Sequence, residues 1–320
     1  MTGEFDLIRD HFMRSPRPPR RAAVGIGDDC ALLDLAPGMQ LAVSSDMLVE
    51  GRHFLSTVAP QRLGHKALAV NLSDLAACGA EPLAFTLALS LPRADVDFVA
   101  AFARGLFALA DQHAIELIGG DTTAGPLNIC ITVFGQAPPG QALLRSGARA
   151  GDDLWVSGTL GDARLALEVF RGTLALAGDA FERVRQAMEL PLPRVALGMA
   201  LRGHASSAID LSDGLLGDLR HVLESSGVGA RVDLDALPRS ADLAAQPAAV
   251  QLECLLAGGD DYELLFTASP QQREAVMNAG AAADVTVTRC GTVEAEAGVR
   301  VVDRQGRLIS HGLRSFDHFA

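Results

Sequence analysis

The spacing of apolar residues along the chain alternates between the period of a β-strand and the period of an α-helix. Short apolar runs of strand length are separated by longer stretches in which apolar residues recur every three or four positions. In the first half of the chain, this pattern predicts strands at 39–46, 83–91, 115–121 and 128–135 and helices at 62–80 and 94–114. The order of these segments predicts a block of mixed α/β structure.

A similar pattern follows residues 135–152, a connector that is rich in glycine and proline. Beyond this connector, the pattern predicts strands at 153–158, 206–210, 229–235 and 262–267, short strands near the C-terminus, and helices at 161–172, 193–203 and 213–227. The predicted fold class is therefore α/β or α+β, with one domain over 1–150 and a second over 151–320.

The overall charge narrows the classes of partner. The chain of 320 residues has 27 lysines and arginines against 39 aspartates and glutamates, a net charge of −12. Nucleic-acid binding requires basic side chains that neutralise phosphates, so we expect no nucleic-acid partner. The most apolar stretch, LAFTLALSLP, is about half as long as a membrane-spanning helix, and the first residues, MTGEFDLIRDHF, lack the apolar core of a secretory signal. We therefore expect a cytoplasmic protein without a membrane partner.

Residue types exclude two common kinds of site. The five cysteines include no CxxC pair, which argues against a disulfide framework and against a zinc site. Lys66, in LGHKAL, is the only lysine, whereas a P-loop requires the pattern GxxxxGK[ST]. A Walker-type nucleotide site is therefore excluded.

Aspartates next to glycine or serine are the most distinctive chemical feature of the sequence. They lie in six short segments, at 25–30, 44–46, 71–74, 119–123, 209–214 and 258–263. Asp46, Asp121 and Asp210 each end an apolar strand-like run, where open α/β sheets place ligand-binding residues. Taken singly, each segment also fits a turn or a helix N-cap, as Asp213 does before the helix that follows it.

Asp74 is the aspartate that a turn or a cap explains least well. It lies within the apolar helix-like segment ALAVNLSDLAAC, and burying an unpaired carboxylate is costly. The sequence offers two partners, a contact with Lys66 two helical turns earlier or a bound metal ion. Oxygen ligands without histidine or cysteine clusters suit Mg²⁺, which proteins bind through carboxylates together with substrate phosphates. We therefore expect the aspartates to bind Mg²⁺ beside a polyphosphate.

The motifs also occur in the order of a known family. GIGDDCALL, SSDMLVEGRHF, KALAVNLSDLAACGAEP, LIGGDTT, AIDLSDGLLGDL and GGDDYELLF resemble the thiamine-monophosphate kinases of the aminoimidazole ribonucleotide synthetase-like superfamily. The resemblance covers nearly the whole chain. It implies a two-domain fold whose N-terminal domain forms a dimer, and an enzyme that phosphorylates thiamine monophosphate to thiamine diphosphate with ATP. It further implies direct in-line transfer, assisted by several Mg²⁺ ions and requiring no protein base.

The resemblance assigns roles to individual residues. The positions that match metal ligands are Asp29, Ser44, Ser45, Asp46, Asp74, Asp121, Asp210 and Asp213. The positions that match nucleotide contacts are Gly120, Asp121, Arg145 and Ser212, and those that match contacts with thiamine monophosphate are His53, Asp260 and Phe316. Two positions depart from the usual pattern, because the family commonly has glutamate where Asp260 stands and Trp or Tyr where Phe316 stands.

Other functions remain open at this point. An ATP-dependent ribonucleotide cyclase of the same superfamily would share the ATP and metal chemistry, although the EGRHF segment and the C-terminal DHF favour the kinase. A non-catalytic nucleotide-binding scaffold would be expected to have lost metal-binding aspartates, and every expected aspartate is present. A selenophosphate-type enzyme would require a cysteine beside a lysine near the N-terminus, and Cys30 has no lysine nearby.

Overall fold

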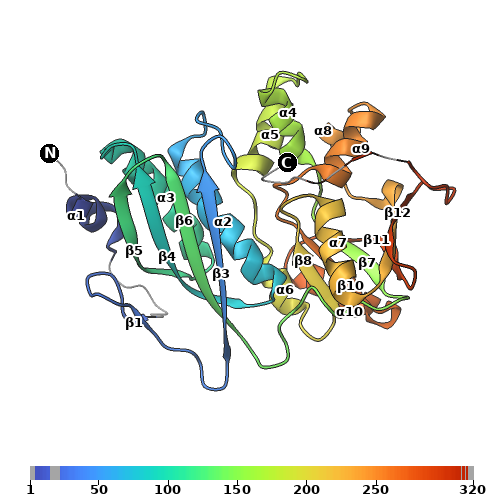
Figure 1. The fold of residues 1–320 in the computed structure, drawn as a ribbon, viewed down its shortest axis with the longest axis horizontal. Coiled ribbons are helices and arrows are strands. Elements are labelled where there is room, and N and C mark those ends of the chain that lie inside the picture. The colour runs from blue at the N-terminus through green and yellow to red at the C-terminus, as the bar shows by residue number, and fades with distance from the viewer. Residues whose placement is uncertain (1–3, 15–21, 311, 314, 316–320) are drawn as a thin grey trace. The chain divides into compact units, whose positions relative to one another are not determined.

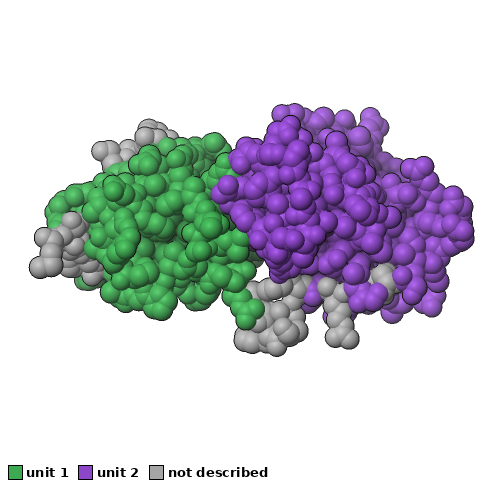
Figure 2. Space-filling model, turned by 90° about the horizontal axis from the view of Figure 1, so that it is seen from above, with its two compact units in different colours: residues 1–75, 80–140 green, residues 76–79, 141–320 purple. Residues whose placement is uncertain are grey.

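The structure is a computed structural model that describes residues 4–14, 22–310, 312–313 and 315. The chain divides into two compact units, which are coloured separately in Figure 2. Unit 1 comprises Met1–Leu75 and Ala80–Gly140, and unit 2 comprises Ala76–Gly79 and Gln141–Ala320. The main division therefore lies within the connector that is rich in glycine and proline.

Unit 1 is built on a four-stranded sheet with helices on one face (Figure 1). The strand order is β3 (Gln40–Val49), β6 (Asn128–Ala137), β4 (Glu81–Leu91) and β5 (Glu116–Ala124). Neighbouring strands are antiparallel except β4 and β5, which are parallel. The helices are α2 (Pro60–Ala77) and α3 (Val96–Gln112), and the N-terminal elements are α1 (Glu4–Leu7), a π-helical turn (Ile8–Phe12), β1 (Ala22–Val24) and β2 (Leu32–Leu33).

Helices α2 and α3 approach each other closely because glycine stands where they meet. A Cβ atom on Gly64 of α2 would lie 2.0 Å from the carbonyl oxygen of Phe102, and one on Gly105 of α3 would lie 1.8 Å from that of Gln61. Both distances are far below van der Waals contact, so a side chain at either position would force the two backbones apart. Much of α2 is buried, including Lys66, which is 2% exposed.

The two faces of β3 have different surroundings. Leu41, Val43 and Met47 are 49%, 55% and 54% exposed, whereas the even-numbered positions from 42 to 48 are half-buried or buried. Successive side chains of a strand point to opposite faces of its sheet. One face of β3 is therefore packed within unit 1, and the other presents a row of exposed apolar side chains.

Unit 2 contains a six-stranded sheet. Its strand order is β12 (Gly298–Val302), β9 (Gly229–Asp233), β11 (Val287–Glu294), β7 (Asp153–Ser157), β10 (Leu264–Ala268) and β8 (Ser207–Asp210), antiparallel except for β12 and β9. The helices are α4 (Asp162–Phe170), α5 (Gly178–Glu189), α6 (Val195–Ala200), α7 (Leu215–Ser226), α8 (Ala241–Ala244), α9 (Ala248–Ala257) and α10 (Arg273–Ala282). Two short 3₁₀ turns cover Leu234–Ala236 and Pro270–Gln272.

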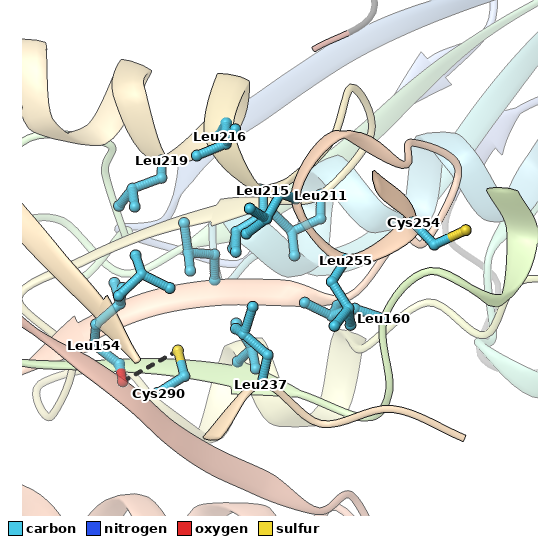
Figure 3. Packing of buried hydrophobic residues seen from close by; sticks show 14 of the residues in the cluster. Leu154, Leu160, Leu211, Leu215, Leu216, Leu219, Leu237, Cys254, Leu255 and Cys290 are labelled. Atoms are coloured by element: carbon cyan, nitrogen blue, oxygen red, sulfur yellow. Dashed lines mark hydrogen bonds between the residues drawn. The ribbon is translucent and has the colours of Figure 1, made fainter. Parts of the chain in front are cut away.

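The core of unit 2 lies between its sheet and the helices that pack on it (Figure 3). Leu154 of β7 and Leu215 and Leu219 of α7 are each at most 1% exposed. The thiol of buried Cys290 donates to the carbonyl oxygen of Leu154 at 3.5 Å. This apolar packing fixes the strand ends of β8 and β10, from which the loops of the candidate site begin.

The fold class predicted from the apolar spacing is confirmed, and each segment predicted as a strand or helix forms that element with bounds shifted by a few residues. Helices α1, α5, α8, α9 and α10 were not predicted. Among the described residues, no helix is both long enough and apolar enough to cross a membrane.

Candidate active site

In unit 1, the packed face of β3 brings three of the expected site residues next to helix α2. The hydroxyl of Ser44 donates to the carboxylate of Asp74 at 2.5 Å. The backbone N–H of Asp46 donates to the side-chain oxygen of Asn71 at 3.1 Å, and the Asn71 amide in turn donates to the Ala67 carbonyl at 2.9 Å. Strand and helix are thus joined by side-chain hydrogen bonds where Asp46 and Asp74 lie. The expected contact between Asp74 and Lys66 stays a prediction.

Ser44 and Ser45 lie on opposite faces of β3. While Ser44 contacts α2, the Ser45 hydroxyl donates to the Ile131 carbonyl at 3.2 Å and lies 3.0 Å from the Thr132 hydroxyl. Neighbouring strand residues alternate between faces, so the two hydroxyls cannot reach one ion within a single chain. If both serines contact metal, they contact different ions or Ser45 uses its backbone oxygen.

The glycine-rich end of β5 lies at the other edge of the same sheet. Register places Asp46 of β3 and Gly120 of β5 in one row, with Ile131 and Leu87 between them. Three strand spacings separate the two ends of that row, about 14 Å. Asp121, which follows Gly120, is exposed.

Gly120 has a structural requirement of its own. Its φ is +146°, and a Cβ atom would lie 1.9 Å from the carbonyl oxygen of Leu87 on β4. The close approach of β5 to β4 therefore demands glycine here, whether or not a ligand is bound. Gly119 has no such constraint, since the nearest atom to its Cβ position lies 3.8 Å away.

His53 and Asp29 lie in loops of unit 1. The Nδ1 atom of His53 accepts the backbone N–H of Val49 at 3.0 Å, and the His53 backbone N–H donates to the Val49 carbonyl at 3.0 Å. An imidazole that accepts at Nδ1 carries its proton on Nε2, so His53 presents a donor at that atom. Asp29 is exposed, and its backbone N–H donates to the Asp28 carboxylate at 2.9 Å.

In unit 2, two of the aspartate-bearing segments are joined into one structure beyond the ends of β8 and β10. Asp210, at the end of β8, pairs with Leu264 of β10 and is 6% exposed. Past this pair, three backbone hydrogen bonds of 2.8 to 2.9 Å connect the loops. The N–H of Leu211 donates to the Glu263 carbonyl, the N–H of Tyr262 donates to the Leu211 carbonyl, and the N–H of Asp260 donates to the Ser212 carbonyl. Ser212, Asp213 and Asp260 are therefore held in adjoining loops. Their assignments to nucleotide, metal and substrate stay predictions.

Two carboxylates stabilise these loops from inside. Asp218 of α7 accepts the backbone N–H groups of Asp213 and Gly214, both at 3.1 Å. Burial, and secondly the negative charge of Asp213, raise the pKa of Asp218 to about 7. Asp261 accepts the backbone N–H of Gly161 at 2.9 and 3.0 Å, and burial raises its pKa well above the ordinary value. Negative charge is thus crowded at this end of unit 2.

A buried ion pair supports the same segment and was not predicted from the sequence. The guanidinium of Arg194 donates to both carboxylate oxygens of Glu263, and the hydroxyl of Ser157 donates to the same carboxylate. The Ser157 hydroxyl also accepts the backbone N–H of Leu264 at 2.8 Å. Glu263 lies 69 residues from Arg194, so periodicity gave no sign of the pair. The only available signal was the acid inside the apolar run YELLF, because a buried carboxylate requires a partner.

Two expected residues are still to be placed, Arg145 and Phe316. Arg145 is exposed in the connector, and its carbonyl oxygen accepts the Ser226 hydroxyl at 3.4 Å. Phe316 lies outside the described residues, so its assignment stays a prediction.

The donor atoms in both units suit a hard divalent cation. Carboxylate and hydroxyl oxygens predominate, as Mg²⁺ prefers, and crowded carboxylates such as Asp213 and Asp218 would be stabilised by positive charge. Within the described residues, no three histidine, cysteine, aspartate or glutamate side chains are assembled as a metal site. The residues therefore fit Mg²⁺ by chemistry, and substrate phosphates would supply further oxygens.

Comparisons with known proteins agree with this geometry. Residues 27–137 match the N-terminal domain model of AIR synthase related proteins, and residues 149–304 match the C-terminal domain model. A thiamine-monophosphate kinase of Salmonella typhimurium is 45% identical over 322 residues, covering 99% of this chain and 98% of its own. The crystal structure of thiamine-monophosphate kinase from Stenotrophomonas maltophilia is 47% identical with a TM-score of 0.85, and covers 91% of this chain and 93% of its own.

A further solved structure contains ligands. AaThiL complexed with AMPPCP and TMP has a TM-score of 0.78 and 29% sequence identity, over 89% of each chain. Two mixed α/β units with loops rich in aspartate, each matching its family model, define a two-domain AIR synthase related protein. Within that group, identity over the full length shows that the chain belongs to the thiamine-monophosphate kinase family.

Proposed function

We propose that the protein transfers the γ-phosphate of ATP to thiamine monophosphate, forming thiamine diphosphate. The observation that carries the proposal is the 45% identity to a thiamine-monophosphate kinase along 99% of the chain. The joined loops of unit 2 add to it, because Ser212, Asp213 and Asp260 lie in adjoining loops. ATP as co-substrate is supported by the ATP analogue in the related AaThiL complex.

The chain's own residues orient and hold the reactants. The Ser44 hydroxyl fixes the Asp74 carboxylate, and Asn71 fixes the backbone at Asp46. His53 directs an Nε2–H donor, which suits an anionic phosphate, and Arg145 offers a cation to the nucleotide. The acceptor oxygen of a phosphate monoester is already ionised near neutral pH, since its second pKa is about 6. No residue therefore has to remove a proton for in-line attack.

Mg²⁺ completes this proposal. The residues that would hold it are Asp29, Ser44, Ser45, Asp46, Asp74 and Asp121 in unit 1 and Asp210 and Asp213 in unit 2. When bound, it would neutralise phosphate charge and help to align the two substrates. Because Ser44 and Ser45 point to opposite faces, and Asp46 and Asp121 lie on opposite edge strands, the proposal requires more than one ion.

The dimer and the location are further parts of the proposal. The exposed apolar side chains of Leu41, Val43 and Met47 form a flat row on β3, which suits a second copy of the chain. A cytoplasmic location would supply ATP.

The test is ADP release from Mg-ATP with thiamine monophosphate, with free thiamine and with no acceptor. We expect ADP only with the monophosphate, together with thiamine diphosphate, and loss of both products on chelation of Mg²⁺. ADP formed equally in all three would overturn the kinase and favour a ribonucleotide substrate, as for the cyclase. No ADP in any of them would favour the non-catalytic scaffold.

A further inference from the structure

Tyr262 stands beside the expected substrate carboxylate and has no role in the function described so far. It is the only tyrosine of the chain. Its hydroxyl donates to one carboxylate oxygen of Asp260 at 3.0 Å, and the residue is 8% exposed. A hydrogen bond to an ionised acceptor is stronger than one between neutral groups, so this contact fixes where the carboxylate points.

The backbone around this contact is in an uncommon conformation. Asp260 has a φ of +69° and Tyr262 a φ of +51°, and among the described non-glycine residues only Ala114 and Asp284 share this left-handed region. This conformation is unfavourable for a residue with a side chain, so the surrounding structure has to enforce it. In this conformation the hydroxyl of residue 262 reaches back to the carboxylate of residue 260.

The tyrosine is anchored on both sides. Its backbone N–H donates to the Leu211 carbonyl at 2.8 Å, and that of Asp260 donates to the Ser212 carbonyl at 2.9 Å. The next residue, Glu263, is held by Arg194 and Ser157. The phenol therefore acts from a fixed frame, and its hydrogen bond restricts the rotamers open to the Asp260 side chain.

We propose that Tyr262 is a positioning residue that holds the Asp260 carboxylate in the orientation required to contact thiamine monophosphate. The inference rests on the proposed function, in which Asp260 contacts that substrate. Aspartate has a short side chain, so its carboxylate has a small range of useful positions. The hydroxyl of Tyr262 selects one of them before the substrate arrives, which lowers the entropy lost on binding.

Tyr262→Phe tests the proposal in the full-length protein. We expect KM for thiamine monophosphate to rise about three- to tenfold with kcat changed less than about twofold, because only the orientation of a binding group is lost. KM for ATP should not change. If Tyr262 only filled space, the phenylalanine ring would fill the same space and leave KM unchanged, and that result would overturn the proposal.

A double-mutant cycle with Asp260→Ala tests whether Tyr262 affects KM through the Asp260 carboxylate. Asp260→Ala alone should raise KM for thiamine monophosphate, and adding Tyr262→Phe should then change KM no further. Independent effects of the two substitutions would contradict positioning through Asp260. If the wild-type protein does not phosphorylate thiamine monophosphate, the proposed function fails and this inference fails with it. If the wild type is active and Tyr262→Phe has the same KM for thiamine monophosphate, only this inference is refuted.

A second measurement does not depend on the folding of a variant. Since Tyr262 is the only tyrosine, isotope-labelled tyrosine gives a single set of ring signals in NMR spectra of the otherwise unchanged protein. These signals should shift when thiamine monophosphate is added and should not shift with ATP alone. Ring signals whose chemical shifts do not change on addition of thiamine monophosphate would overturn the proposal.

Discussion

At the scale of single residues, the residues expected to hold metal are themselves held by hydrogen bonds with neighbours, one of which, Asn71, is not an expected ligand. Asn71 is 1% exposed and connects the backbone of Asp46 to helix α2. The hydroxyl of Ser44 makes the corresponding contact with Asp74. A carboxylate orientated in this way loses little freedom when a cation binds, which favours affinity.

Asp74→Asn should reduce kcat by about 10²- to 10³-fold, because the amide keeps the shape but loses the charge that neutralises bound cations. The free energy of unfolding should change little, since Asn can still accept the Ser44 hydroxyl. Steady-state kinetics measure kcat, and urea denaturation measures the free energy of unfolding. Asp97→Asn, on the exposed first turn of α3, is the matched control and should behave as the wild type. A fully active Asp74→Asn protein would remove this residue from the site.

Asp153 determines a pH dependence of stability away from the site. The hydrogen bond from Arg273, and secondly that from Arg289, lower the pKa of this buried carboxyl below its ordinary value. The stabilisation is therefore complete above the unfolded-state pKa of about 3.9 and is lost as pH falls through the lower folded value. Asp153→Asn should lower the free energy of unfolding by about 1–3 kcal/mol near neutral pH, since both arginines are half exposed.

The measurement is urea denaturation of the wild type and of Asp153→Asn over a series of pH values. The difference between the two proteins should shrink as the pH falls below the unfolded-state pKa of about 3.9 and through the lower folded-state value. A difference that stays constant through that range would mean that the charge of Asp153 is not what stabilises the protein.

At the scale of elements, periodicity predicted the helices and strands whose apolar faces are regular. Helices α3 and α7 were found in this way, whereas the largely apolar α9 has only a weak helical period. Helix α5 has a clear apolar stripe and could have been predicted from the same pattern. The site was predictable only as a list of residues. The alternation of Ser44 and Ser45, and the pairing of Arg194 with Glu263, depend on register and on long-range packing that a local pattern does not encode.

Gly105→Ala tests the close approach of α2 and α3. The new methyl carbon would lie 1.8 Å from the Gln61 carbonyl oxygen, so the helices would have to separate, and we expect a loss of about 3 kcal/mol in the free energy of unfolding. Alanine favours an isolated helix over glycine, so a stabilised variant would contradict the close packing. Arg104→Ala, at the exposed neighbouring position, is the control and should change stability by less than about 0.5 kcal/mol. Thermal unfolding of both variants gives the comparison.

At the scale of the whole molecule, the exposed row on β3 bears on assembly. Val43→Asp places a charge in the middle of that row and should convert the proposed dimer into a monomer. Leu192→Asp, at a residue of unit 2 that is 59% exposed, is the control and should leave the mass unchanged. Light scattering coupled to size-exclusion chromatography measures both. A wild type that runs as a monomer would refute the dimer directly.

The buried position of Lys66 gives the molecule a natural chemical reporter. The chain has one lysine, and it is 2% exposed within helix α2. Reagents that modify primary amines should therefore reach the Lys66 side chain only when α2 opens to solvent. The rate of Lys66 labelling would measure how often the core of unit 1 opens to solvent, without any engineered probe.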